Sequence, residues 1–156
     1  MLHNLVAMEK NMSLQAVISS VKTFCDSYNI PVNNSPTSSV SSDQIALRHR
    51  LMEEENNEYI EAAQAGDLIE IADALGDQLY ILCGTILSHG MQDVIEDVFR
   101  EIQSSNMSKL GDNGQPIVRE DGKILKGPNY FRPDLKSVLD KHSEGRHKSQ
   151  LEAEVS

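Results

Sequence analysis

Residues 51–83 read LMEEENNEYIEAAQAGDLIEIADALGDQLYILC, and the organisation of the whole chain follows from this segment. Its apolar residues recur at helical spacing, about 100° per residue, on both sides of the turn residues Ala65-Gly66-Asp67. The pattern therefore predicts two amphipathic helices joined by a short turn. The apolar face of the first helix contains Leu51, Met52, Tyr59, Ala62 and Ala63.

The second predicted helix is apolar nearly all round, which is typical of a helix buried inside a protein. Three acids interrupt it, Glu70, Asp73 and Asp77, and their spacing places them on one stripe. In the preceding helix, Glu55 lies in the middle of the apolar face and Glu58 lies at its margin. The apolar residues of the second helix are Leu68, Ile69, Ile71, Ala72, Ala74, Leu75, Leu79, Ile81 and Leu82.

Carboxylates in a protein core need a balancing positive charge, because an isolated buried carboxylate costs several kcal/mol or more. No Lys, Arg or His lies between Leu51 and Tyr80. A divalent metal ion is the economical source of that charge, and oxygen ligands on two facing helices favour Mg²⁺ or Mn²⁺ over zinc. A solvated acidic face is the alternative explanation, and it is preferred for Glu53, Glu54 and Glu61, which point away from the apolar face.

The run Glu54-Glu55-Asn56-Asn57-Glu58, followed by Glu70-Ile71-Ala72-Asp73, resembles the EExxE…ExxD signature of the all-α nucleoside triphosphate pyrophosphohydrolases. This superfamily includes MazG-like proteins and phosphoribosyl-ATP pyrophosphohydrolase. The resemblance covers roughly residues 14–135. It implies an all-α fold with a four-helix-bundle core of MazG-like type, followed by a C-terminal extended arm or small hairpin.

The resemblance also implies a reaction, the conversion of a (d)NTP to a (d)NMP and pyrophosphate by water attack at the α-phosphorus. Mg²⁺, or Mn²⁺, would be held by Glu55, Glu58, Glu70 and Asp73. Glu54, Glu55 and Asp77 are the candidate catalytic carboxylates, with Asp77 or Glu54 orienting or deprotonating the water.

Four further residues are candidates for binding the substrate. Arg48 falls on the same helix face as Glu55, two turns away, where it can pair with an acid or a phosphate. The run Asn106-Met107-Ser108-Lys109 resembles the superfamily's Asn-x-x-Lys element, which implies that Asn106 binds the sugar and Lys109 the phosphates. Complementing a helix dipole is the alternative role for Lys109. Tyr130 lies in an arm that can stack on the base or pack against a neighbouring subunit.

The flanking segments have simpler patterns. Apolar periodicity predicts a helix from Ser13 to about Tyr28, and the helix that carries Glu55 is expected to start at Ser42 or Asp43. The segment between them, rich in Ser, Asn and Pro, is expected to be a linker or long loop. A loop of this length is often functional or mobile, and a plain polar connector is the preferred alternative. Gly90 is expected to end the apolar helix.

Beyond Gly90, a fourth helix is expected from about Met91. Turn signals after Leu110 predict a small hairpin formed by residues 116–118 and 124–125. A short helix is expected over residues 134–139. We expect a single domain over residues 1–140 and a disordered charged tail over 141–156.

The composition limits the classes of partner. The chain has 156 residues and a net charge of −10, which argues against nucleic-acid or anionic-membrane surfaces. Cys25 and Cys83 lie on apolar faces and are expected to be buried thiols without a disulfide. With no leader or membrane-spanning run, a cytoplasmic protein is expected. The surplus of apolar surface, and the resemblance, favour a homodimer or homotetramer.

Three alternative functions remain at this point. A di-iron carboxylate bundle requires Glu-x-x-His pairs, and neither acid pair here has its histidine. A non-catalytic helical scaffold that keeps a metal for stability would show the same acids without turnover. Phosphoribosyl-ATP is the alternative substrate to a (d)NTP.

Overall fold

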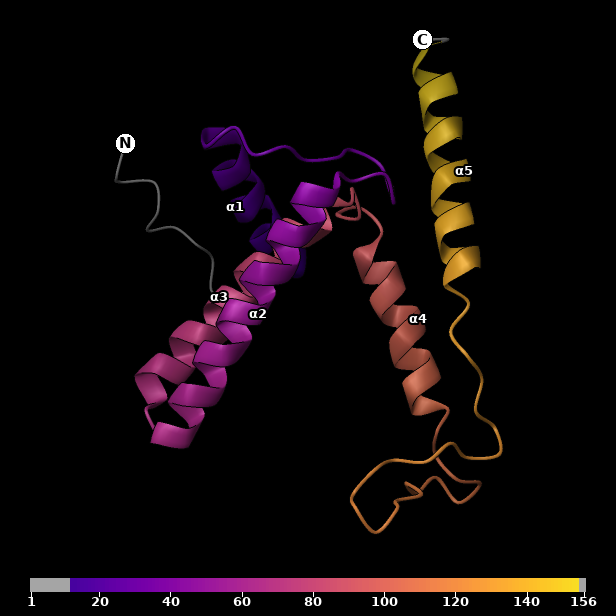
Figure 1. Ribbon diagram of the computed structural model, residues 1–156. Helices are drawn as coiled ribbons and strands as arrows, with labels where there is room; N and C mark the ends of the chain where they lie inside the picture. Colours follow the sequence, from indigo (N-terminus) through magenta and orange to yellow (C-terminus); the bar gives the residue numbers. More distant parts are fainter. Residues whose placement is uncertain (1–11, 155–156) are drawn as a thin grey trace. The chain divides into compact units, whose positions relative to one another are not determined.

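The computed structural model describes residues 12–154, in which every regular element is a helix (Figure 1). The chain divides into two compact units, residues 1–92 and residues 93–156. The all-α fold is confirmed. The bundle of four helices and the single domain over 1–140 stay predictions, because the fourth helix belongs to the second unit. The helices are α1 (Leu14–Ser27), α2 (Ser42–Ala65), α3 (Leu68–Ser88), α4 (Ile95–Met107) and α5 (Leu135–Glu154).

Local capping signals position the helices of the first unit. The Ser13 side chain accepts a hydrogen bond from the Ala16 N–H and so starts α1, as predicted. Gly66, in the left-handed conformation with φ 70°, ends α2. The Asp67 side chain then accepts from the N–H groups of Ile69 and Glu70 and starts α3. The predicted pair of helices with a tight turn is confirmed, and α2 and α3 lie side by side (Figure 1).

The core of the first unit lies at the C-terminal half of α3. Leu87 and Cys83 are fully buried there, and α1 packs against α3 through its buried residues Ile18, Val21 and Cys25. Both cysteines are buried free thiols, as predicted. None of the helices in residues 12–154 has the length and apolar character needed to cross a membrane.

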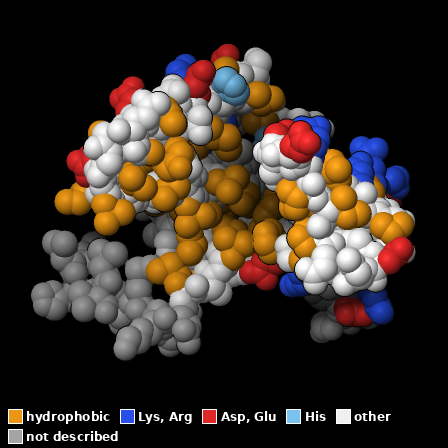
Figure 2. All heavy atoms as spheres, turned by 90° about the horizontal axis from the view of Figure 1, so that it is seen from below, with side chains coloured by type: hydrophobic (Ala, Val, Ile, Leu, Met, Phe, Trp, Pro, Cys, Tyr) orange, Lys and Arg blue, Asp and Glu red, His pale blue; other side chains and the backbone are white. Residues whose placement is uncertain are grey.

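Much of α3 is exposed, so the prediction that this helix is buried nearly all round is wrong for a single chain. Leu68 and Ile69 are 76% and 79% exposed, and Leu75, Leu79 and Leu82 are also exposed. The physical reason is that, within the described residues of the first unit, α3 packs against two helices, α1 and α2, which cover only part of its circumference. Figure 2 shows hydrophobic side chains gathered on the surface of the first unit.

The loop between α1 and α2 is fixed to the C-terminal end of α3. The backbone N–H of Asn33 donates to the Leu87 carbonyl at 3.0 Å, and its side-chain amide donates to the Ser88 carbonyl at 2.7 Å. The Thr37 N–H donates to the His89 carbonyl at 3.0 Å. This segment, expected to be either a plain polar connector or a functional or mobile loop, is therefore held by hydrogen bonds to residues far away in the sequence.

The contact between this loop and the end of α3 leads to a prediction about Gly90, which has φ +65°. A Cβ at Gly90 would lie 2.0 Å from the Ser35 carbonyl oxygen, whereas a Cβ at Gly66, with φ +70°, would meet nothing within 4 Å. Both alanine variants suffer the left-handed conformation, about 1 kcal/mol, but only Gly90→Ala adds a steric conflict of about 1–3 kcal/mol. Urea unfolding should therefore show the larger loss for Gly90→Ala. Equal losses would mean that the loop does not pack on Gly90.

The second unit contains α4, a hairpin and α5. Helix α4 begins at Ile95, later than the predicted Met91, because the Met91 N–H donates to the Ile86 carbonyl and closes the end of α3. The predicted small hairpin is confirmed by the antiparallel bridge between Val118 and Ile124.

Helix α5 corrects a prediction. The sequence predicted a short helix over 134–139 and a disordered tail, but α5 runs from Leu135 to Glu154, and residues 155–156 lie outside the described range. The Asp134 side chain accepts hydrogen bonds from the Ser137 N–H and hydroxyl, Lys136 pairs with Asp140, and α5 packs on α4. Capping and tertiary contact thus stabilise a segment whose charge alone indicated disorder.

Candidate active site

The acids predicted to form the site come from both helices of the α2–α3 hairpin. Glu54, Glu55 and Glu58 lie on α2, and Glu70, Asp73 and Asp77 lie on α3. Glu55 is half-buried, while the other five residues are exposed. The Oε2 atom of Glu55 is buried without a hydrogen-bond partner. A buried polar oxygen of this kind is costly unless something pairs with it.

Glu55 lies at the centre of the negative charge. Burial, followed by the charges of Glu58, Asp77, Glu54 and Asp73, raises the pKa of Glu55 above its ordinary value. Acids of both helices therefore lie near enough to Glu55 to oppose its ionisation. Within residues 12–154, none of these carboxylates forms an ion pair with a Lys, Arg or His.

Packing between α2 and α3 fixes the register of the two helices, and the register determines which acids lie beside one another. The side-chain amide of Gln78 donates to the Glu55 carbonyl at 3.3 Å. Ala62 on α2 and Ala74 on α3 are buried, and their small side chains permit close approach of the two helices. The register of the hairpin therefore places Glu55 beside the stripe of α3 that carries Asp73 and Asp77.

The donor set was compared with what a divalent metal ion requires. Within the described residues, no three Asp, Glu, His or Cys side chains are placed so as to hold a metal ion. The chemistry nevertheless fits Mg²⁺ or Mn²⁺, since all donors are carboxylate oxygens, one buried oxygen has no partner and no side-chain cation neutralises them. Repulsion between unneutralised carboxylates opposes their convergence. Glu55, Glu58, Glu70 and Asp73 are the residues that could hold the ion.

Arg48 occupies a different place from the acids. It is half-buried on α2, and a Cβ on Gly84 of α3 would lie 2.4 Å from its guanidinium, so this guanidinium packs directly on α3. Arg48 also lines a pocket of about 300 Å³ in the first unit. Arg48 therefore contacts α3, and within residues 12–154 it forms no ion pair with an acid. Its predicted role in binding an acid or a phosphate stays a prediction.

The remaining predicted substrate residues lie in the second unit. The Lys109 ammonium donates to the Asn106 side-chain oxygen at 2.8 Å, which brings together the two residues of the Asn-x-x-Lys element. The Lys126 ammonium lies 4.3 Å from the centre of the Tyr130 ring. The Gly127 N–H donates to the Lys109 carbonyl at 2.9 Å, so the arm is attached to the end of α4. Substrate binding by Asn106, Lys109 and Tyr130 stays a prediction.

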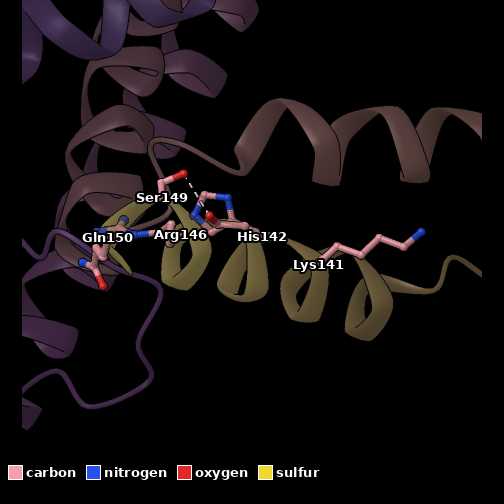
Figure 3. Close-up of a pocket in the computed structure, with 6 residues that line it drawn as sticks. Lys141, His142, Arg146, Ser149 and Gln150 are labelled. Atoms are coloured by element: carbon pink, nitrogen blue, oxygen red, sulfur yellow. Dashed lines mark hydrogen bonds between the residues drawn. The ribbon is translucent and has the colours of Figure 1, made fainter. Parts of the chain in front are cut away.

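Two other pockets in the second unit contain none of the predicted site residues. One, of about 480 Å³, is lined by side chains of α5, including His142, Arg146 and Ser149 (Figure 3). The other, of about 450 Å³, is lined by residues of α4 and α5, including Asp97, Glu101 and His142. The acids of α2 and α3 therefore remain the candidate for chemistry.

Comparison with known protein families identifies the family to which the chain with these acids belongs. The family model described as phosphoribosyl-ATP pyrophosphohydrolase matches residues 21–106, which is more than half of the chain. The chain belongs to this family. The phosphoribosyl-ATP pyrophosphohydrolases form part of the MazG-like superfamily of nucleoside triphosphate pyrophosphohydrolases, so the resemblance found in the sequence is confirmed. A search of curated proteins finds no match to the chain.

Membership in the phosphoribosyl-ATP pyrophosphohydrolase family indicates a hydrolase of nucleotide metabolism, a pyrophosphohydrolase with a nucleotide substrate. The matched range includes Arg48, all six acids and Asn106. Lys109, Tyr130 and α5 lie beyond it, so the hairpin arm and the last helix are features of this chain outside the family match.

Sequence reasoning missed the partners of Arg48. Gly84, Gln44 and Ser88 contact it or line its pocket, and none of them was among the predicted site residues. For Gly84 the sequence does contain a signal, because a glycine inside a helix often marks the close approach of another group. Gln44 and Ser88 had no such signal, since their hydrogen bond joins two residues 44 positions apart, on α2 and α3.

Glu55 supports a prediction about stability in the absence of metal. Its pKa is raised in the folded state, so folding favours the protonated form, and this contribution is lost as the pH rises through the folded-state pKa. Glu55→Gln stays neutral at every pH. In chelator, we expect the variant to exceed the wild type in free energy of unfolding by about 1 kcal/mol at pH 8, with a smaller gain at pH 5. Urea titrations at both pH values measure this difference, and a gain independent of pH would contradict it.

Proposed function

We propose that this protein is a Mg²⁺-dependent nucleoside triphosphate pyrophosphohydrolase that converts a (d)NTP to a (d)NMP and pyrophosphate. The observation that carries the proposal is the set of unpaired carboxylates on α2 and α3, centred on the buried Glu55 oxygen that lacks a partner. Family membership supports the hydrolysis of a nucleotide with pyrophosphate as a product.

The carboxylates have two tasks in the proposed reaction. Glu55, Glu58, Glu70 and Asp73 hold Mg²⁺, which when bound neutralises the charge of the triphosphate and of the leaving pyrophosphate. Asp77 or Glu54 accepts a proton from a water molecule, and the water oxygen forms a bond to the α-phosphorus. The bond from the α-phosphorus to the bridging oxygen breaks, and that oxygen leaves with pyrophosphate. Positioning and electrostatics account for the acceleration, as in other phosphoryl transfers.

The substrate residues have secondary tasks. Lys109 contributes positive charge for the phosphates, Asn106 hydrogen-bonds the sugar and Tyr130 stacks on the base. The pair formed by Lys109 and Asn106 supports this assignment, because their side chains are already joined by a hydrogen bond. Arg48 on α2 is the second candidate to contribute positive charge for the phosphates.

Phosphoribosyl-ATP is the second candidate substrate, favoured by the description of the matched family. It contains the same triphosphate, so hydrolysis at the α-phosphorus would use the same carboxylates. The two candidates therefore differ in the recognition of the remote end of the substrate, not in the bond that breaks.

The assembly is proposed to be a homodimer, or a homotetramer built from it. Leu68, Leu75, Leu79 and Leu82 form an exposed stripe on α3. Counting about 100° per residue, this stripe lies roughly opposite the stripe of Glu70, Asp73 and Asp77. A second copy can therefore cover the leucines and leave the acids open to substrate.

The test is an incubation of the purified protein with canonical and modified nucleoside triphosphates and with phosphoribosyl-ATP. Pyrophosphate and orthophosphate are measured separately, in Mg²⁺, in Mn²⁺ and in chelator. The proposal expects pyrophosphate in either metal and none in chelator. A folded protein that binds Mg²⁺ but hydrolyses no substrate would instead support the non-catalytic scaffold.

A further inference from the structure

Residues 127–131 belong to the arm that joins α4 to α5 (Figure 1), and their first attachment to α4 is at Gly127. The Gly127 N–H donates to the Lys109 carbonyl at 2.9 Å. A Cβ on Gly127 would lie 2.2 Å from the Leu110 carbonyl oxygen, so the two backbones approach too closely to admit a side chain. The start of the segment is therefore held against the residues that directly follow α4.

The second attachment is at Phe131. The hydroxyl of the buried Ser105 donates to the Phe131 carbonyl at 2.8 Å. The Phe131 N–H donates to the Ser108 hydroxyl at 3.1 Å. Between the two attachments, the Tyr130 N–H donates to the Gly127 carbonyl at 3.2 Å and closes a turn. Backbone groups and α4 side chains thus fix residues 127–131, and none of these hydrogen bonds involves the side chain of Lys126.

The attachment at Gly127 places Lys126 beside Lys109. The hydrogen bond from Gly127 to Lys109 joins the peptide group that follows Lys126 to the peptide group that follows Lys109. The two lysines are therefore neighbours in space, although they are far apart in the sequence. Within residues 12–154, neither lysine forms an ion pair with a carboxylate. Two adjacent positive charges without an acid partner favour a ligand that carries several negative charges.

The arm also differs in charge from the rest of the chain. Residues 106–133 contain five basic residues and three acids, whereas the whole chain has a net charge of −10. Two of the three acids have partners in the arm, since Asp121 pairs with Arg119 and Asp112 accepts from the Asn129 amide at 3.0 Å. The arm therefore attracts anions that most of this acidic chain repels.

The Lys126 ammonium is held by a contact that a phosphate can displace. It lies 4.3 Å from the centre of the Tyr130 ring, and Lys126 is exposed. A cation above an aromatic ring is attracted only weakly at an exposed site. Phosphate oxygens form stronger, charge-assisted hydrogen bonds with an ammonium group. Transfer of the ammonium to a phosphate is therefore favourable, and it uncovers the face of the Tyr130 ring that the ammonium had occupied.

We propose that Lys126 is a further phosphate-binding residue, which forms with Lys109 one cationic site for the triphosphate of the substrate. The inference rests on the proposed function and deepens it, because it assigns a residue of the arm to the same ligand. The matched family range ends at residue 106, so Lys126 lies outside it. The cationic site is thus completed by a part of this chain that the family model does not include.

Titration calorimetry with inorganic tripolyphosphate in chelator tests the site without metal and without turnover. The wild type should bind tripolyphosphate, and Lys126→Gln should bind it about fivefold more weakly or worse, because one charge-assisted hydrogen bond is lost at an exposed position. Lys126→Arg keeps the charge and should bind within about twofold of the wild type.

Lys123→Gln is the matched control. It removes an exposed lysine from the same arm and keeps the hydrogen bond that the Lys123 backbone N–H donates to Asp121. Its affinity for tripolyphosphate should stay within about twofold of the wild type. A wild type that does not bind tripolyphosphate, or equal affinities in the two glutamine variants, would overturn the proposal.

Hydrolysis separates failure of this inference from failure of the proposed function. With the best triphosphate substrate, Lys126→Gln should raise KM about fivefold or more, whereas Lys123→Gln should leave it unchanged. If no triphosphate is hydrolysed but tripolyphosphate binding depends on Lys126, the proposed function fails and the cationic site stands. If triphosphates are hydrolysed but neither KM nor tripolyphosphate binding responds to Lys126→Gln, the cationic site fails and the proposed function stands.

Discussion

Glu70→Gln is expected to lower kcat for pyrophosphate release roughly 100-fold or more, the scale of losing one preorganised electrostatic group at a reacting phosphate. Gln has nearly the same shape but cannot supply the negative charge that binds Mg²⁺. The fold should be retained, because the Glu70 side chain is exposed. The hydrogen bond between Glu70 and Asp67 is donated by the Glu70 backbone N–H, which the variant keeps. Steady-state rates with separate detection of pyrophosphate measure the loss.

Glu61→Gln is the matched control for that experiment. Glu61 is exposed on α2 and is not among the proposed ligands or catalytic acids, so its neutralisation should change kcat less than about twofold. Mg²⁺ titrations should show weaker binding for Glu70→Gln only. If the two variants behave alike, the acids on α3 are part of a solvated face and hold no metal.

Leu79→Lys is expected to convert the assembled protein to monomers. Leu79 lies in the exposed stripe of α3, and a lysine there would have to be buried without a partner if a second copy covers the stripe. Such a charge costs several kcal/mol, enough to weaken association more than 100-fold. Sedimentation velocity over a range of protein concentrations gives the mass of each species.

Gln64→Lys provides the corresponding control. Gln64 is an exposed polar residue on α2, and the same charge placed there should leave the mass unchanged. The free energy of unfolding of Leu79→Lys, measured where both proteins are monomeric, should differ little from that of the wild type. A wild-type protein that stays monomeric at every concentration would contradict the proposed dimer.

The helices and turn of the first unit could be predicted because their signals are local. Ser13 caps α1, Gly66 adopts the left-handed conformation at the end of α2, and Asp67 caps α3, each within a few residues of the helix it positions. The position of the acids on facing helices could be predicted for the same reason, since spacing along a helix determines which residues share a face. Their roles as metal ligands and catalytic groups stay predictions, because within the described residues no three of these side chains are placed so as to hold a metal ion.

Features that depend on distant contacts could not be predicted. The loop after α1 folds onto α3 through the bonds of Asn33 and Thr37, and this contact forms the pocket of Arg48. The part of α5 beyond residue 140 was predicted to be disordered, because nothing in its charge pattern reports the packing of α5 on α4. The apolar character of α3 indicated a buried helix, but a pattern of residues does not say whether the same chain covers it, and several of its leucines are exposed.

Hydrolysis in ¹⁸O-labelled water tests the central claim most directly, that the carboxylates of α2 and α3 direct water to the α-phosphorus. The protein is incubated with Mg²⁺ and the best substrate of the panel, and both products are analysed by mass spectrometry. Attack at the α-phosphorus predicts one ¹⁸O atom in the nucleoside monophosphate and none in the pyrophosphate. Label in the pyrophosphate, or release of labelled orthophosphate, would contradict the account.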